Sequence, residues 1–220
     1  ELGKVQGLQW FRIHYAYPNR LSDEMIRAIA ETHNCAKYLD MPLQHASSQL
    51  LKKMSRGGSS ESFGRLIGKI RAACPEIHLR SNFIVGFPGE TEEDFLTTYS
   101  YLAALPVSYL HVFPYSERAN TYAVDIHPKV DGMQKSERSK MLHILSDKKR
   151  RAFYESQLNK TGNVLFEEST DNGLMEGFSE NYVRLAVPYD PLLINTVQPV
   201  RYKSIMDSGD VKGEILIVGR

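Results

Sequence analysis

Residues 84–91, IVGFPGET, place two glycines and an acidic residue between an apolar run and a stretch with helical character. Gly86 and Gly89 would let a ligand approach the backbone, and free N–H groups at a helix start attract carboxylates and phosphates. Glu90 could hold a ribose hydroxyl or an ammonium group. Short glycine motifs also recur by chance, so an ordinary glycine–proline turn with a helix-starting carboxylate is the alternative interpretation.

Residues 42–48, PLQHASS, follow another apolar run in a corresponding place. Gln44, His45 and Ser47 supply hydrogen-bonding side chains there, which suit a polar small molecule. Ser47 and Ser48 equally suit the start of a short helix, because serine oxygens accept hydrogen bonds from helix N–H groups. Both segments therefore predict a small-molecule site, and the alternative is that they only form a turn and a helix start.

The histidines raise a different hypothesis, that of a metal-dependent hydrolase. His14, His45, His78 and His111 all lie in or next to predicted strands, and Asp40 could join them as a ligand. Two of the histidines fall at carboxyl ends of strands, one near an amino end and one in mid-strand. Because these positions do not converge on one point, we expect no metal site.

The composition limits the possible classes of protein. Of 220 residues, 42% are hydrophobic and 24% charged, which excludes disordered, collagen-like and membrane-embedded chains. Lys and Arg total 27 against 26 Asp and Glu, which argues against a uniformly basic protein that coats nucleic acid. Its first residues, ELGKVQGLQW, do not show the charged and apolar regions of a signal peptide, and no apolar run reaches membrane-spanning length, so we expect a cytoplasmic location and no membrane partner. The first residue is not Met, which suggests a piece of a longer protein.

Two cysteines, Cys35 and Cys74, are too few for a disulfide framework, a four-thiolate zinc site or a three-thiolate cluster site. We expect both to be small thiols without ligands.

Alternating strand and helix patterns must position these residues. The strands are predicted at 8–15, 38–41, 77–85 and 108–113, and the helices at 23–32, 48–54, 59–74 and 91–105. This α/β pattern predicts a partial, open β/α barrel over residues 1–130, with its chemistry at the carboxyl ends of the strands.

The remaining sequence divides into two segments of opposite charge. Residues 131–160 predict one long connecting helix, with 8 basic and 3 acidic residues between positions 135 and 160. Residues 161–220 contain four short β-like runs (VLFEE, YVRLAV, VQPVRY and GEILIV) and predict a small antiparallel β-barrel. This tail has 5 basic and 9 acidic residues.

Three long segments, taken in order, carry a family resemblance: YLDMPLQHASSQLLKKMSRGG, IVGFPGETEEDF and SYLHVFPYSERANTYA. They resemble the methylthiotransferases, a family of radical S-adenosylmethionine (SAM) enzymes. GLMEGFSENYVRLAV resembles the TRAM module that closes these enzymes. The family inserts a methylthio group into an unactivated C–H bond, with one iron–sulfur cluster cleaving SAM into a radical and a second delivering sulfur.

The resemblance implies roles for particular positions. Residues implied to line the SAM and substrate cavity are Gln44, Ser47, Asn82, Gly86, Gly89 and Glu90. Those implied to lie beside the adenine are Phe113, Tyr115 and Ser116. Candidate substrate contacts are Arg12 and His14 at the first strand, and Asn181, Tyr182 and Arg184 in the TRAM-like tail, where barrel packing is the alternative. We assign no catalytic and no metal-binding residue.

The family's cluster ligands have no match in this sequence. Its radical cluster is held by C-x3-C-x2-C and its auxiliary cluster by three further cysteines, and Cys35 and Cys74 fit neither set. The resemblance therefore implies SAM and two 4Fe–4S clusters, with a reductant, in a parent protein. We expect this chain alone not to perform the reaction.

Different segments of the sequence resemble two branches of the family that act on different substrates. WFRIHYAYP with PLQHASS resembles the branch that modifies an aspartate of a small-subunit ribosomal protein. SYLHVFPYSERANTYA, KSERSKMLHILSDKKRRAFY and VLFEE resemble the branch that acts on threonylcarbamoyladenosine in transfer RNA, although Asn120 stands where that branch usually has glycine. We favour transfer RNA, because the basic helix belongs to the second signature and RNA affinity depends on phosphate contacts. The alternatives are the ribosomal protein, which would suit the acidic tail, and a noncatalytic RNA-binding fragment.

Overall fold

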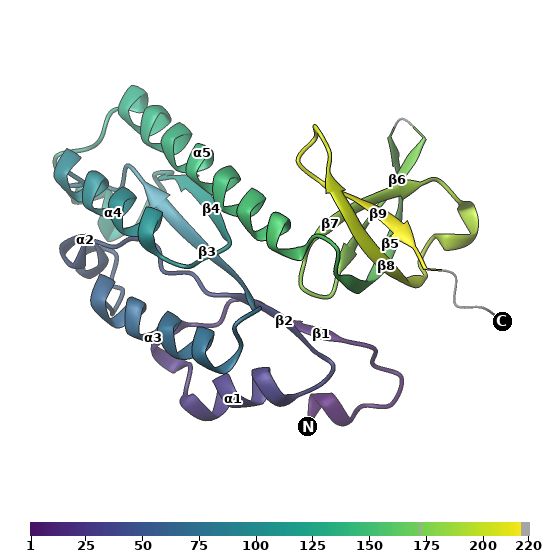
Figure 1. The fold of residues 1–220 in the computed structure, drawn as a ribbon. Coiled ribbons are helices and arrows are strands. Elements are labelled where there is room, and N and C mark those ends of the chain that lie inside the picture. Colours follow the sequence, from purple (N-terminus) through teal and green to yellow (C-terminus); the bar gives the residue numbers. More distant parts are fainter. Residues whose placement is uncertain (172, 217–220) are drawn as a thin grey trace.

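The computed structural model describes residues 1–171 and 173–216. A parallel sheet with its helices forms one unit, a closed β-barrel forms the other, and one long helix joins them (Figure 1). The predicted α/β architecture, with a partial barrel followed by a long helix and a small β-barrel, is confirmed.

The sheet has four parallel strands in the order β1-β2-β3-β4. Its strands are β1 (Phe11–Ile13), β2 (Cys35–Asp40), β3 (His78–Val85) and β4 (Tyr109–Pro114). Its helices are α1 (Asp23–Glu31), α2 (Ser48–Lys53), α3 (Ser60–Ala73) and α4 (Glu92–Ala104). Only three residues of the predicted first strand form β1, whereas β2 begins earlier than predicted.

Polar side chains start the helices as the sequence indicates. Ser22, Ser47, Ser59 and Thr91 each accept a hydrogen bond from a backbone N–H in the first turn of α1, α2, α3 and α4. These N–H groups have no partner within their own helix, so each cap contributes roughly 1 kcal/mol.

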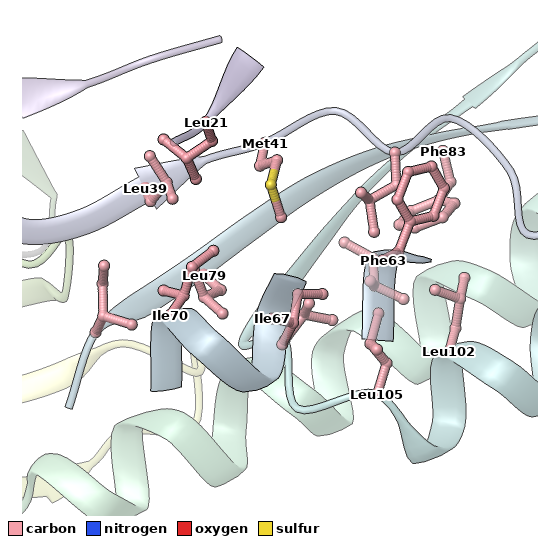
Figure 2. Packing of buried hydrophobic residues seen from close by; sticks show 14 of the residues in the cluster. Leu21, Leu39, Met41, Phe63, Ile67, Ile70, Leu79, Phe83, Leu102 and Leu105 are labelled. Atoms are coloured by element: carbon pink, nitrogen blue, oxygen red, sulfur yellow. The ribbon is translucent and has the colours of Figure 1, made fainter. Parts of the chain in front are cut away.

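Strand alternation gives the sheet two unlike faces. Leu39, Leu79 and Phe83 point toward the helices, where they pack with residues such as Ile67 and Leu102 in a continuous apolar core (Figure 2). Successive side chains of a strand point to opposite faces, so Asp40, Arg80 and their neighbours lie on the other face. We call this second surface the helix-free face.

The long helix α5 (Gly132–Gln157) contributes to both cores. Leu142 and Leu145 pack in the core of the sheet unit, whereas Phe153 and Tyr154 pack in the core of the barrel. Because one continuous helix contributes to both, it couples the two units mechanically.

The barrel is closed, with the strand order β5-β6-β7-β9-β8. Its strands are β5 (Thr161–Asp171), β6 (Leu174–Ser179), β7 (Arg184–Pro188), β8 (Val197–Ile205) and β9 (Val211–Ile215). The prediction of a purely antiparallel barrel is wrong in one pairing, since β7 and β9 run parallel. The predicted runs also omitted β6, in which Gly177 interrupts a short sequence of mixed polarity.

Candidate functional site

A cavity of about 450 Å³ opens at the carboxyl ends of β3 and β4. Five of the nine side chains predicted to bind SAM line it: Gln44, Asn82, Phe113, Tyr115 and Ser116. Arg118 and Thr121 complete its polar wall from the loop after β4. The cavity lies where a parallel α/β sheet usually presents its ligand site.

Gln44 extends the sheet beyond β2 and so fixes this wall. Its backbone N–H donates to the backbone carbonyl of Asn82 at 2.8 Å, and its backbone carbonyl accepts from the backbone N–H of Ile84 at 3.0 Å. Its φ is +71°, a conformation that turns the chain sharply at the cavity edge.

Asn82 offers the cavity an unsatisfied polar atom. The residue is only 7% exposed, and within the described residues no hydrogen-bond partner reaches its Oδ1. A buried carbonyl without a partner costs about 1–3 kcal/mol. A ligand with an N–H or O–H donor would satisfy it.

Aromatic side chains form another wall. Phe113 is 42% exposed, and Tyr115 packs edge-on against Phe87 with ring centroids 5.1 Å apart. Lys135 of α5 lies over the Tyr115 ring, with Nζ 5.5 Å from its centroid. Exposed aromatic faces of this kind suit stacking with a planar base.

The loop after β4 keeps a sharp turn at Asn120. Asparagine stands here where the transfer RNA branch of the family usually has glycine. The structure holds Asn120 at φ +63°, and asparagine is among the residues that adopt this conformation most readily.

The other four predicted SAM residues do not line the cavity: Gly86, Gly89 and Glu90 form the turn after β3, and Ser47 begins α2. Gly86 and Gly89 have φ of +72° and +79°, which explains glycine at both positions. Ser47 donates to Asp94 Oδ1 at 2.7 Å and thereby ties α2 to α4. Glu90 is directed into the protein interior, so the predicted contact with a ribose or ammonium group has no support in its geometry.

The Glu90 carboxylate is fully buried within a charged cluster. It accepts a hydrogen bond from the Gly86 N–H, and Arg138 Nη1 of α5 lies 3.4 Å from Oε2. His45 Nε2 lies 3.6 Å from Oε1. Since His45 Nδ1 accepts from the Ser47 N–H at 3.0 Å, its neutral form carries the proton on Nε2, which faces Glu90.

Sequence reasoning missed Arg138. It was counted among the basic residues of the long helix, yet it is only 4% exposed and pairs with Glu90 and Glu92. Residue type and spacing contain no signal for this position, because the pairing depends on how α5 packs across the sheet unit.

The predicted substrate contacts Arg12, Asn181 and Tyr182 instead join the barrel to the sheet. Arg12 donates to the carbonyls of Ser179 and Glu180 and lies over the Tyr182 ring at 4.9 Å. Tyr182 also stacks on Tyr38, with ring centroids 4.9 Å apart. The carbonyl of Asn181 accepts from Nδ1 of the buried His78 at 2.8 Å. These contacts place the three residues, all partly exposed, at the interface between the barrel and the sheet.

The remaining two predicted substrate contacts are separate from this interface. Arg184 pairs with Glu176 and lies 3.9 Å from Asp210, all within the barrel. His14 is exposed at the end of β1, with its ring 5.2 Å from that of Tyr38. The structure therefore does not gather the five predicted substrate residues into one site.

The His, Cys, Asp and Glu side chains of the described residues do not gather into a metal-binding group. Across residues 1–171 and 173–216, no group of three His, Cys, Asp or Glu side chains could hold a metal ion. Cys35 and Cys74 are free and buried in the apolar core, and burial raises the pKa of the Cys74 thiol to about 11. These residues do not fit an iron–sulfur cluster, whose ligands are thiolates.

The helices in the described part of the chain differ from membrane-spanning helices. None of them is both long enough and apolar enough to cross a bilayer.

Comparison with known proteins agrees with this geometry. The radical SAM superfamily matches residues 2–102. Coproporphyrinogen III oxidase from Escherichia coli, described as a radical SAM enzyme, shares the fold with a TM-score of 0.54 at 13% identity. The alignment covers 76% of this chain and 46% of that one. The family match and the shared fold are those of the radical SAM superfamily.

Curated relatives identify a family within the radical SAM superfamily. Ribosomal protein uS12 methylthiotransferase RimO of Acetivibrio thermocellus is 30% identical over 98% of this chain and 49% of its own length. The RimO proteins of Moorella thermoacetica and Koribacter versatilis are 34% and 39% identical, over 97% and 69% of this chain and 50% and 31% of their own lengths. The chain belongs to the radical SAM methylthiotransferase family, and it spans about half or less of the length of these relatives.

Proposed function

We propose that this chain is the SAM-binding half of a methylthiotransferase that modifies an aspartate of ribosomal protein uS12. The observation that carries the proposal is the cavity at the carboxyl ends of β3 and β4, which contains the unsatisfied side-chain carbonyl of Asn82 and the exposed ring of Phe113. A ribosomal-protein substrate implies a cytoplasmic location for the parent protein.

The lining residues fit SAM. The adenine of SAM offers amino hydrogens for the Asn82 carbonyl and a planar face for Phe113 and Tyr115. Gln44 and Ser116 present further hydrogen-bonding groups at the same cavity. Bound SAM supplies, on reductive cleavage, the radical that breaks the substrate C–H bond.

The other residues of the site hold the cavity and the barrel in position. Glu90 and Arg138 hold the turn after β3 beside the cavity, and the interface formed by Arg12, Tyr182 and Tyr38 fixes the barrel against the sheet. The two buried cysteines do not fit the family's 4Fe–4S clusters. We therefore assign the clusters, and with them the reductant, to parts of the parent protein outside this chain.

The substrate assignment replaces the prediction of transfer RNA. Relatives named for uS12 align over 97–98% of the chain, including the half whose motifs suggested transfer RNA. We propose that the β5–β9 barrel is a TRAM module. Its acidic residues outnumber its basic ones, which suits a basic ribosomal protein better than an RNA backbone.

Modification of the two substrates by the parent protein tests this proposal. The parent, with its clusters reconstituted under anaerobic conditions, would be given SAM, reductant and either uS12 or unmodified transfer RNA. We expect mass spectrometry to find a methylthio group on an aspartate of uS12 and none on the RNA. Methylthiolation of the RNA alone would contradict the proposal.

A further inference from the structure

A row of polar side chains crosses the middle of the helix-free face. Asp40 of β2 is paired with Arg80 of β3, and His14 follows β1 next to Asp40. His111 of β4 is paired with Asn82, two positions beyond Arg80, and its ring reaches back to the Arg80 guanidinium. We call these four residues the central row. By strand register they lie between the barrel interface at Tyr38 and the cavity end of the sheet.

Asp40 is buried without a charge partner. The residue is 2% exposed, and within the described residues its Oδ1 has no hydrogen-bond partner and no basic group forms an ion pair with it. Burial raises the pKa of this carboxyl group, with Arg80, His14 and His111 acting in the opposite direction. An unpaired buried carboxylate is costly, so this group calls for a donor that the described residues do not supply.

Arg80 is held in place without an ion pair among the described residues. Its Nη2 donates to His111 Nδ1, and its guanidinium lies over the Tyr109 ring at 5.7 Å from the centroid. Its Nε is buried and has no hydrogen-bond partner, and no carboxylate of the described chain lies within 4.0 Å of the guanidinium. Two fixed contacts orient a cation whose buried Nε–H has no partner among the described residues.

The central row therefore presents a cation and an acceptor on neighbouring strands, each unsatisfied. An aspartate within a peptide carries the matching groups, because its carboxylate lies close to a backbone N–H. A purine base also offers a donor and an acceptor, but it carries no negative charge to bind the Arg80 guanidinium. Guanidinium binds carboxylates in a planar, two-point geometry, which makes arginine selective for them.

We propose that the central row is the substrate subsite, in which Arg80 binds the carboxylate of the target aspartate and Asp40 accepts an N–H of the peptide backbone. This inference rests on the proposed function and adds to it the residue that selects an acidic side chain. The subsite adjoins the cavity because Asn82 follows Arg80 by two positions on the same face of β3.

The test is a cycle that changes both the enzyme and the substrate. The reconstituted parent, with S-adenosylhomocysteine in place of SAM to prevent turnover, is titrated with uS12 and with uS12 carrying asparagine at the modified aspartate. The wild type should bind the aspartate form about tenfold more tightly, which equals about 1.4 kcal/mol. Arg80→Gln should reduce this preference to within about twofold, and Arg80→Lys should give an intermediate value because lysine lacks the planar fork.

Controls separate recognition from folding. Arg65→Gln changes an exposed arginine of α3 on the helix side and should keep the full preference for aspartate. S-adenosylhomocysteine affinity should stay within about twofold in Arg80→Gln if the row acts on substrate alone. If Arg80→Gln fails to fold, the ratio measured with Arg80→Lys decides, and an unchanged ratio overturns the inference.

Failure of the inference is distinguishable from failure of the proposed function. If wild-type parent modifies uS12 but Arg80→Gln retains the wild-type preference for aspartate over asparagine, the subsite is wrong and the function stands. If the wild type binds transfer RNA and not uS12, and Arg80→Gln weakens that binding, the row serves a nucleic acid and both proposals fall.

Discussion

Replacement of Arg138 by methionine tests how α5 supports the turn beside the cavity. The Glu90 carboxylate is completely buried, and Arg138 Nη1, 3.4 Å away, is its only permanently charged neighbour among the described residues. Arg138→Met keeps most of the side-chain volume but leaves a buried carboxylate with only a backbone N–H and the His45 ring. Loss of one partner of a buried ion pair costs about 3–5 kcal/mol. The free energy of unfolding should fall by that amount.

The assay is urea unfolding followed by tryptophan fluorescence. Trp10, the single tryptophan of the chain, immediately precedes β1 and so reports on the sheet unit. Glu92→Gln is the matched control, because Glu92 pairs with the same arginine at 2.9 Å but is 66% exposed. It should cost less than about 1 kcal/mol.

A double-mutant cycle makes the argument refutable. Glu90→Gln combined with Arg138→Met removes both charges, so the double variant should lose about 1–3 kcal/mol less than the sum of the two single variants. If Arg138→Met costs no more than Glu92→Gln, or if the two changes add without coupling, the buried pair does not stabilise the turn.

Three further predictions concern backbone, thiol and proton chemistry. Gly86→Ala should cost about 1–3 kcal/mol, because φ is +72° and the new Cβ would meet the Lys135 side chain; Gly68→Ala in α3, which meets nothing within 4 Å, should not destabilise. Equal effects in urea unfolding would contradict this. Cys74, whose buried thiol has a pKa of about 11, should react with a disulfide reagent at neutral pH only as fast as the chain unfolds, and rapid labelling of the native chain would be contrary evidence. Burial lowers the pKa of His78 to about 4, so the unfolded chain binds this proton more readily and stability should fall by about 2 kcal/mol from about pH 7 to about pH 5. His78→Gln should flatten that slope, and an unchanged slope would refute the assignment.

The sequence was sufficient for the elements of the sheet unit because their signals are local. Serine and threonine caps and apolar alternation indicated four strands and four helices near their observed places. β1 was overestimated, since apolar character continues past the residues that pair with β2. The parallel β7–β9 pair could not be predicted, because the direction of pairing depends on how distant strands close the barrel.

The site was predicted in part. Gln44 was expected from its place after a strand, and Asn82, Phe113, Tyr115 and Ser116 from the family resemblance, and all five line the cavity. Glu90 resembles a ligand contact in the sequence, yet a distant partner on α5 holds it in the interior. The contacts of Arg12 and Tyr182 depend on docking between two units, and the tertiary arrangement that creates such contacts is not visible in local sequence.

The central claim is that the cavity at the ends of β3 and β4 binds SAM, and Asn82→Leu tests it most directly. Leucine has a similar volume and removes the unsatisfied carbonyl, so the variant should be at least as stable as the wild type. Equilibrium dialysis of labelled SAM against the reconstituted parent protein should nevertheless show at least about tenfold weaker binding. Unchanged SAM affinity in a folded Asn82→Leu variant would contradict the account.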